Sequence, residues 1–226
     1  MKLKIAIDGP AGTGKSTVAK KIAEILEIDY LDTGAMYRAV AKFFLDNNID
    51  PCEIDNNTVE KIFKEINFDF KNNSLYMNGK ILSDEIRSPE VGKIVSKVAS
   101  LEAIRKKLTL IQRELAKGKS IVVEGRDIGT VVLPDAEVKI FLTASAEERA
   151  RRRLKELIEK GINVSFKEVF DEIVQRDRID STRKVAPLRA AKDAVIIDTD
   201  GLTVEEVVEK ILEIVNKKIK KVEKQL

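Results

Sequence analysis

A glycine-rich motif near the start of the chain sets the kind of fold that can follow it. Its eight residues fit the pattern G-x-x-x-x-G-K-[ST] without a mismatch and read Gly9-Pro10-Ala11-Gly12-Thr13-Gly14-Lys15-Ser16. The apolar run at residues 3–7 before the motif is typical of a buried strand, and residues 17–26 after it have the pattern of a helix. This context favours a phosphate-binding loop over a glycine-rich turn with an incidental Lys-Ser pair.

The residue types in the motif suit the binding of phosphate groups. Its glycines let the backbone curl so that N–H groups point at phosphate oxygens, and the following helix adds the partial positive charge of its N-terminus. Lys15 is expected to reach the β- and γ-phosphates of a nucleotide, and the Ser16 hydroxyl is expected to bind Mg²⁺. The sequence therefore predicts a nucleoside triphosphate site at this loop.

Composition narrows the class of protein. The 226 residues, 43% hydrophobic and 35% charged, are typical of one globular α/β domain, and a net charge of +3 does not indicate a general binder of nucleic acid. The absence of histidine excludes a Ser-His-Asp triad and a histidine-ligated metal, and the single cysteine, Cys52, cannot form an internal disulfide. No apolar run is as long as a membrane span, so we expect no signal peptide and a cytoplasmic location.

Five short apolar runs predict the strands of one parallel sheet, with helical patterns between them. The runs cover residues 3–8, 29–31, 120–124, 138–142 and 194–198. The first, third and fourth runs have the nearly continuous apolar character of strands that are covered on both faces. Capping boxes are predicted at the starts of three helices, at Ser145, Ser165 and Thr203. The alternation predicts a doubly wound sheet, which binds ligands at the carboxyl ends of its strands.

Residues 67–82 interrupt this alternation of strands and helices. Apolar and polar residues alternate there, and Asn72-Asn73 and Asn78-Gly79 are turn signals. The segment therefore predicts a small antiparallel hairpin or meander inserted into the α/β body. Sequence leaves two interpretations open, a surface decoration that only packs and part of a mobile flap over a second substrate.

Most of the arginines lie between residues 126 and 189, and arginine rather than lysine suits planar, bidentate contacts with phosphate. Arg126 follows the strand at 120–124, so it emerges at the carboxyl end of the sheet beside the phosphate loop. Farther along, Arg176, Asp180 and Arg183 share one helix face. This face is either a ladder of ion pairs or a lid that closes two arginines onto a transferring phosphoryl group, and the phosphate loop favours the lid.

A cluster of four arginines lies in residues 149–153. Successive helical residues point in directions about 100° apart, so at most one or two of these side chains can reach a ligand. We expect the others to be solvated or paired with nearby glutamates, namely Glu147, Glu148 and Glu156.

A further constellation follows the second predicted strand. Asp32 or Thr33 can cap the helix that begins there, and Arg38 lies one turn into that helix. One interpretation is an ordinary cap with a surface arginine. The other places Thr33, Tyr37 and Arg38 at the mouth of an acceptor site.

Four segments together resemble the bacterial cytidylate kinases. They are residues 7–16, 31–38, 123–132 and 176–183, and Ala186-Pro187-Leu188 and the insertion also match. The resemblance runs from residue 4 to about residue 215. It implies the nucleoside monophosphate kinase fold of P-loop NTPases, an α/β protein with a five-stranded parallel sheet, a small antiparallel insertion and a helical lid. It also implies a monomer that uses Mg²⁺ to transfer the γ-phosphoryl group of ATP to CMP or dCMP.

The resemblance further implies roles for individual residues. The ATP phosphates and Mg²⁺ would contact Gly9, Pro10, Ala11, Gly12, Thr13, Gly14, Lys15, Ser16 and Thr17, with Arg152 or Arg153 at the transferring group. Asp8 would order the water shell of Mg²⁺ or cap the loop. The acceptor nucleotide would contact Thr33, Tyr37, Arg38, Ser96, Arg105, Arg126, Asp127, Asp180 and Arg183, with Ser96 and Arg105 at the cytosine edge. Lys15, Arg126, Arg176 and Arg183 would be catalytic and surround the equatorial oxygens of the γ-phosphoryl group.

The implied organisation is a single domain with three parts. The core would comprise residues 1–34, 100–148 and 190–226, the acceptor-binding region about 35–99, and the lid about 149–189. The alternative functions are another P-loop kinase, such as a UMP or dTMP kinase, and a nucleotide-dependent switch, although no guanine-reading N-K-x-D motif is present. The lysine-rich residues 217–224 continue an amphipathic helix, which favours a solvated face over a nucleic-acid site.

Overall fold

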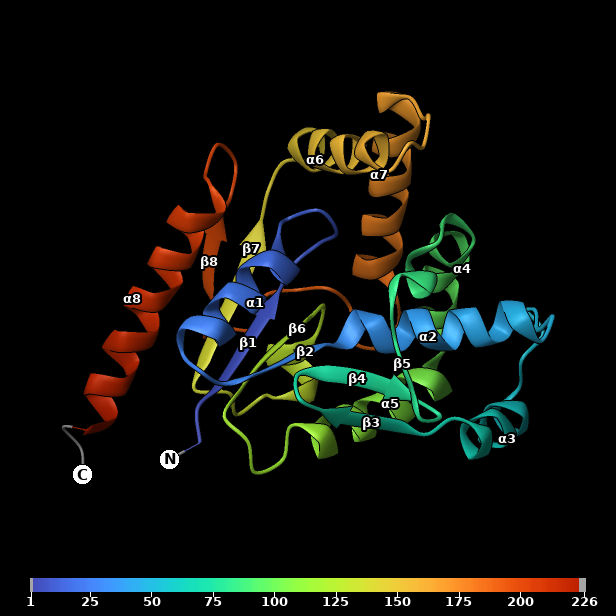
Figure 1. Cartoon of the computed structure of the whole chain (residues 1–226), viewed down its shortest axis with the longest axis horizontal. Helices are drawn as coiled ribbons and strands as arrows, with labels where there is room; N and C mark the ends of the chain where they lie inside the picture. Colours follow the sequence, from blue (N-terminus) through green and yellow to red (C-terminus); the bar gives the residue numbers. More distant parts are fainter. Residues whose placement is uncertain (1, 224–226) are drawn as a thin grey trace.

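A five-stranded parallel sheet forms the centre of the molecule (Figure 1). The structure is a computed structural model that describes residues 2–223. The sheet has the order β2-β6-β1-β7-β8, and its strands are β1 (Lys4–Asp8), β2 (Asp29–Asp32), β6 (Ile121–Gly125), β7 (Val138–Thr143) and β8 (Val195–Asp198). All five predicted strands are confirmed, each within one residue of its expected ends.

Helices cover the two faces of the sheet unequally. On one face, α1 (Lys15–Ile25) and α8 (Val204–Glu223) bury an apolar core with β1, β7 and β8, and Figure 1 shows α8 running along this side. On the other face, the end of α5 (Glu102–Leu115) and the single turn η2 (Ile128–Val132) pack against Ile121 and Val123. The second layer reaches β2, β6 and β1 but leaves the far end of the sheet open.

This unequal cover corrects one expectation. We predicted that the strand at 138–142 is covered on both faces, but only alternate residues of β7 are buried. Phe141 on the other face is half-buried, and Ile196 of the neighbouring edge strand is 62% exposed. The Lys139 side chain on that face is only 9% exposed, because it lies close to Gly129 of η2 and pairs with Asp193 at 2.8 Å. The apolar run resembled a fully covered strand because Phe141 is apolar, although Phe141 belongs to none of the apolar clusters found in the described chain.

A second apolar core lies beside the sheet, among the helices of the region that precedes β6. These helices are α2 (Thr33–Asp46), α3 (Asn56–Glu65), the short η1 (Asp84–Arg87), α4 (Pro89–Ser100) and the first turns of α5. Phe44, Met36, Val98 and Leu108 are fully buried there. This core positions α2 and α5, which carry Arg38 and Arg105, beside the sheet.

The insertion is a three-stranded antiparallel sheet, β3 (Phe68–Lys71), β4 (Ser74–Met77) and β5 (Lys80–Ile81). Asn72 and Asn73 between β3 and β4 both have positive φ, 50° and 56°, as a tight hairpin turn requires. Phe70 is buried against the central sheet, and the Asn73 side chain accepts a hydrogen bond of 2.9 Å from the Tyr30 backbone N–H. The turn is thus anchored to edge strand β2, which supports the packing interpretation over the mobile flap.

Two helices, α6 (Ala146–Glu159) and α7 (Phe166–Thr182), stand above the carboxyl ends of the strands (Figure 1). They share a small core of their own, formed by Ala150, Leu157, Val169 and Ile173. The predicted capping boxes at Ser165 and Thr203 are confirmed. At Ser145 only one of the two bonds of the capping box forms, in which the Ser145 hydroxyl accepts from the Glu148 N–H. The Ser145 N–H donates to Asp200 instead of to the Glu148 carboxylate.

The last helix reaches Glu223, and Val215 and Ile211 on it are buried against the sheet. The side chains of residues 221–226 lie outside the described part, so the lysine-rich face at 217–224 is seen only to residue 220. Among the helices between residues 2 and 223, none has the length and apolar character that crossing a membrane requires.

Candidate active site

The phosphate loop joins the end of β1 to the start of α1 at the carboxyl edge of the sheet. Gly9 has a φ of 150°, and a side chain there would lie 2.1 Å from the Leu142 carbonyl oxygen of β7, so only glycine fits. Gly12 has a φ of 80° and approaches Arg149 of α6, where an added Cβ would be 3.0 Å from the Arg149 Cβ. The loop is therefore held closely between β7 and α6.

Lys15 has the environment of a phosphate ligand. Its ammonium group donates to the Pro10 carbonyl at 2.6 Å and to the Thr13 hydroxyl at 3.4 Å, and it forms no ion pair within the described residues. Burial, followed by the nearby charge of Arg126, holds the pKa of Lys15 well below its ordinary value. A cation so desolvated gains most from an anion that binds next to it, such as a nucleotide phosphate.

Glu124 is a site residue that the sequence analysis missed. It is the fourth residue of β6, aligned with Ile7 of β1, and only 3% exposed. The Tyr30 hydroxyl donates to the Glu124 carboxylate at 2.7 Å. Burial is the largest effect that raises the pKa of Glu124, and the Ser16 hydroxyl is among the groups that oppose it. The sequence feature that could have identified it is an acidic residue directly after the apolar residues 121–123 of a predicted strand.

Asp8 has a different neighbourhood from the one we expected. Its two carboxylate oxygens accept hydrogen bonds of 2.8 Å from the backbone N–H groups of Ile128 and Gly129. It thereby caps η2, whereas we expected it to cap the phosphate loop or order Mg²⁺-bound water. Burial raises the pKa of Asp8 to about 6, although the two N–H donors act to lower it.

The start of α2 brings three predicted acceptor residues to the same edge. Asp32 caps the helix by accepting from the Ala35 N–H at 2.9 Å, and its other oxygen accepts from Arg38 at 2.6 Å. The Thr33 hydroxyl donates to the Glu124 carbonyl at 2.7 Å, and the Tyr37 ring is buried. Arg38 is thus a partly buried, oriented side chain rather than the surface arginine of the alternative interpretation.

The predicted base-reading residues differ in how firmly they are held. Arg105 is buried, donates to Asp127 at 2.6 Å and to the Ala99 carbonyl at 3.0 Å, and lies 5.3 Å from the Tyr37 ring centroid. Its Nε is buried without a hydrogen-bond partner. Ser96 lies half-buried on α4, and no hydrogen bond of its side chain is found among the described residues.

The face of α7 that we predicted is both an ion-pair ladder and a cationic cluster. Asp180 accepts from Arg126 at 3.0 Å and from Arg183 at 3.4 Å. These arginines and Arg176 together lower the pKa of Asp180 against the opposing effect of its burial. Among residues 2–223, the Arg176 Nε is buried without a hydrogen-bond partner, and burial, followed by the charge of Arg126, lowers the pKa of Arg176 to about 10. The Arg183 Nη2 has no hydrogen-bond partner in this part of the chain either, and Asp127 lies 3.8 Å away.

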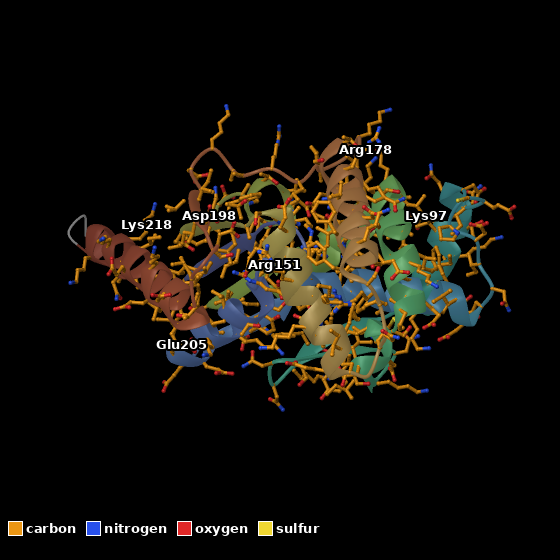
Figure 2. The ribbon with its side chains drawn as sticks, turned by 90° about the horizontal axis from the view of Figure 1, so that it is seen from above. Lys97, Arg151, Arg178, Asp198, Glu205 and Lys218 are labelled. Carbon is orange, nitrogen blue, oxygen red and sulfur yellow. The ribbon has the colours of Figure 1, made fainter. Side chains whose placement is uncertain are left out.

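The arginines of α6 have four different positions. Arg149 is buried and bonded to Asp177 of α7, whereas the other three pair with glutamates of their own helix, as we expected of most of this cluster. Arg152 donates to Glu148 and to the Thr199 carbonyl, whereas Arg153 is 44% exposed and paired with Glu156 at 3.0 Å. Figure 2 looks down on α6 and α7 and shows Arg151 and Arg178 on their outer surface. Arg153 is therefore not brought to the phosphate loop in this structure.

These residues form a site with more positive than negative charge at the carboxyl edge of the sheet. Arg126 and Arg183 share one carboxylate, and neither Lys15 nor Arg176 forms an ion pair in the described part of the chain. That part also holds no cluster of three or more acidic, cysteine or histidine side chains that could bind a metal unaided. The arrangement suits two phosphate-bearing ligands, one on the loop and one between α2, β6 and α7.

Comparison with known proteins agrees with this geometry. A family model described as cytidylate kinase matches residues 5–217. The cytidylate kinase of Thermosipho melanesiensis is 57% identical over 220 residues, which cover 97% of this chain and 100% of that protein. The cytidylate kinase of Thermosipho africanus is 53% identical over 221 residues, covering 97% of each chain. A solved structure of shikimate kinase from Acinetobacter baumannii in complex with shikimate, with 16% identity, shares the fold at a TM-score of 0.50 over 96% of this chain and 94% of that one.

Proposed function

The chain belongs to the cytidylate kinase family, and from that premise we propose how its residues carry out the reaction. The enzyme is a phosphotransferase that moves the γ-phosphoryl group of ATP to CMP or dCMP and forms the corresponding diphosphate. Phosphoryl transfer depends mainly on positioning and on charge stabilisation, so the proposal concerns which groups hold each phosphate.

On the donor side, we propose that the loop from Gly9 to Thr17 binds the ATP phosphates. Its backbone N–H groups and the N-terminus of α1 supply donors. Lys15 supplies an ammonium group that forms no ion pair in the described chain, although Glu124 and Asp8 lie near enough to act on its pKa. Arg152 lies near this edge through its bonds to Thr199, and Arg153 would need the lid to move before it could reach ATP. Arg152 is therefore the better supported of the two arginines.

The residues beside the loop fit Mg²⁺, which prefers oxygen ligands and keeps several of its waters. We propose that the Ser16 hydroxyl holds the ion together with the nucleotide phosphates, and that the buried Glu124 carboxylate orients its water shell. Mg²⁺ would neutralise negative charge on the phosphates when it is bound. Asp8 is less suited to this role because both of its oxygens accept from backbone amides.

On the acceptor side, we propose that Arg38, Arg126 and Arg183 bind the phosphate of CMP. Thr33, Tyr37, Asp127 and Asp180 would line the sugar, and Ser96 and Arg105 would read the cytosine edge. The unpaired Nε of Arg105 and its position on the Tyr37 ring support a ligand at this place. The assignment of Ser96 rests on the family resemblance alone.

For the transferring group, we propose that Lys15, Arg126, Arg176 and Arg183 stabilise the charge on the γ-phosphoryl oxygens. The observation that carries this proposal is that the Nε of the partly buried Arg176, near the charge of Arg126, is buried without a hydrogen-bond partner among the described residues. A buried guanidinium N–H without an acceptor is costly unless an anion joins it. The phosphoryl group in transfer is such an anion.

We further propose that the molecule works as a monomer in the cytoplasm and does not bind nucleic acid. Its single domain would divide into a core of residues 1–34, 100–148 and 190–226, an acceptor-binding region of about 35–99, and a lid of about 149–189. The net charge of +3 supports the absence of a general nucleic-acid site. Size-exclusion chromatography with light scattering tests the monomeric state. Filter binding of RNA and DNA at moderate salt tests the absence of nucleic-acid binding.

The first experiment is a coupled ADP-release assay with ATP, Mg²⁺ and CMP, dCMP, UMP, dTMP, AMP or GMP. Rapid ADP release with CMP and dCMP alone supports the proposed base-reading residues. Preference for another monophosphate would keep the phosphate sites but reject Ser96 and Arg105 as readers of cytosine. Slow loss of ATP that no monophosphate accelerates would contradict the proposed acceptor site as a whole.

A further inference from the structure

Arg87 lies at the acceptor edge of the sheet, although neither the sequence motifs nor the family resemblance draws attention to it. It is the last residue of η1, and its guanidinium donates to Asp32 Oδ2 at 3.1 Å. The same oxygen accepts from Arg38 at 2.6 Å. Two guanidinium groups from different elements therefore meet at one carboxylate oxygen at the carboxyl end of β2.

Two arginines share one paired carboxylate at this point. Burial acts to raise the pKa of Asp32, but Arg38 and Arg87 outweigh it and the pKa is lowered. Within the described chain, Asp32 is the single carboxylate that forms an ion pair with either guanidinium group. Glu124 also lies near Asp32, but it accepts from the Tyr30 hydroxyl and pairs with neither arginine. A phosphate dianion would therefore give each guanidinium group a further anionic partner.

Arg87 is free enough to bind a ligand. Its side chain is 42% exposed, and the bond to Asp32 is the single hydrogen bond of its guanidinium within the described chain. Arg113 shows the contrasting case, since it is bound to the Val131 and Val132 carbonyls and ties α5 to η2. Arg87 could instead simply tie η1 to α2, and the experiment below separates these roles.

We propose that Arg87 is a further ligand of the acceptor phosphate, presented by η1 opposite Arg38 and held at Asp32 until that phosphate binds. The inference rests on the proposed assignment of Arg38 to the same phosphate. Because η1 leads directly into α4, a bond from Arg87 to the phosphate would also draw the start of α4 toward the acceptor.

The test compares the affinities of CMP and cytidine, which differ by the phosphate group. Dissociation constants are measured by ligand-detected NMR for the full chain and for the variants Arg87→Ala, Arg87→Lys and Arg38→Ala. Arg151→Ala is the matched control, because Arg151 is an exposed arginine in a long ion pair on α6. Affinity for ATP and the thermal midpoint of each variant establish that the fold is intact.

We expect Arg87→Ala to weaken CMP binding about tenfold to a hundredfold, as loss of a charge-assisted contact does, with cytidine affinity unchanged. Arg87→Lys should lose less, because it keeps the charge without the bidentate fork. Equal losses for CMP and cytidine, or no loss, would overturn the role of Arg87. If Arg38→Ala also leaves CMP affinity unchanged, the proposed acceptor-phosphate site itself is wrong, whereas a loss in Arg38→Ala alone rejects only Arg87.

Discussion

Arg149 on α6 holds Asp177 on α7 through two hydrogen bonds, of 3.1 Å at Nη1 and 2.6 Å at Nη2. The same guanidinium donates to the Ala11 carbonyl of the phosphate loop at 3.1 Å and to the Ala144 carbonyl after β7 at 3.1 Å. One buried side chain thus connects the loop to the helix that carries Arg176. It follows that Arg149 fixes the first turn of α6 and the adjacent part of α7 to the phosphate loop.

Replacement of Arg149 by alanine should weaken both the fold and the reaction. The change leaves the partly buried Asp177 without its partner, so we expect the free energy of unfolding to fall by about 2–4 kcal/mol. Because the loop loses its support at Ala11, the KM for ATP should rise while the KM for CMP changes less. Urea unfolding and steady-state kinetics measure these effects, with Arg151→Ala as the control. A variant as stable and as active as the control would contradict this connection.

Asp8 should make the stability of the fold depend on pH. Its pKa is raised from 3.8 to about 6, so the folded protein binds this proton more tightly than the unfolded chain does. Stability from this group is therefore fully present below about pH 4 and is lost as the pH rises through 6. Relative to Asp8→Asn, the free energy of unfolding of the native chain should fall by about 2.4 kcal/mol between pH 4 and pH 7.

Urea unfolding of both proteins across this pH range tests the prediction. Groups far from Asp8 titrate equally in the two chains, so the difference between the curves reports Asp8 together with its electrostatic effect on Asp127 and Lys15. The asparagine amide also faces a backbone N–H, which adds an offset that does not change with pH. Curves that stay parallel between pH 4 and pH 7 would contradict the raised pKa.

The sheet and the phosphate loop could be predicted from sequence because each has a local signal. Continuous apolar runs mark the strands, and the loop has a fixed spacing of glycines, lysine and serine. The exposed face of β7 could not be predicted, because it depends on whether a helix distant in sequence packs there. The insertion was predicted as a hairpin from its Asn-Asn and Asn-Gly turns, but its attachment to Tyr30 depends on a contact across 43 residues.

In the site, too, residues within local motifs could be predicted, whereas residues defined by contacts distant in sequence could not. The family resemblance named Arg38, Arg126 and Arg183 because they lie in distinctive motifs. Glu124 and Arg87 could be identified as candidate site residues only from the structure, which shows β6 beside β1 and Arg87 beside Asp32. The bonds of Asp8 could not be predicted for a related reason, since its partners Ile128 and Gly129 lie 120 and 121 residues away.

Tyr30 should act on the reaction through Glu124. The Tyr30 hydroxyl donates to the Glu124 carboxylate and favours its charged form, so Tyr30→Phe should raise the pKa of Glu124 further. The acidic limb of the pH–rate profile should move to higher pH, and half-maximal activity should need more Mg²⁺. The ring remains in the core, so we expect the free energy of unfolding to fall by only about 1 kcal/mol. An unshifted acidic limb would show that Glu124 does not act in the reaction.

Arg183 should affect both CMP binding and turnover. Its guanidinium lies between Asp127 and Asp180, and its Nη2 is buried without a hydrogen-bond partner. A phosphate oxygen at this position would supply the missing acceptor, so Arg183→Ala should raise the KM for CMP and lower kcat by about 10²–10³. The KM for ATP should change little. The matched control is Arg178→Ala, which removes an exposed arginine from the same helix. Steady-state kinetics of the Arg183 variant that match those of this control would exclude Arg183 from both roles.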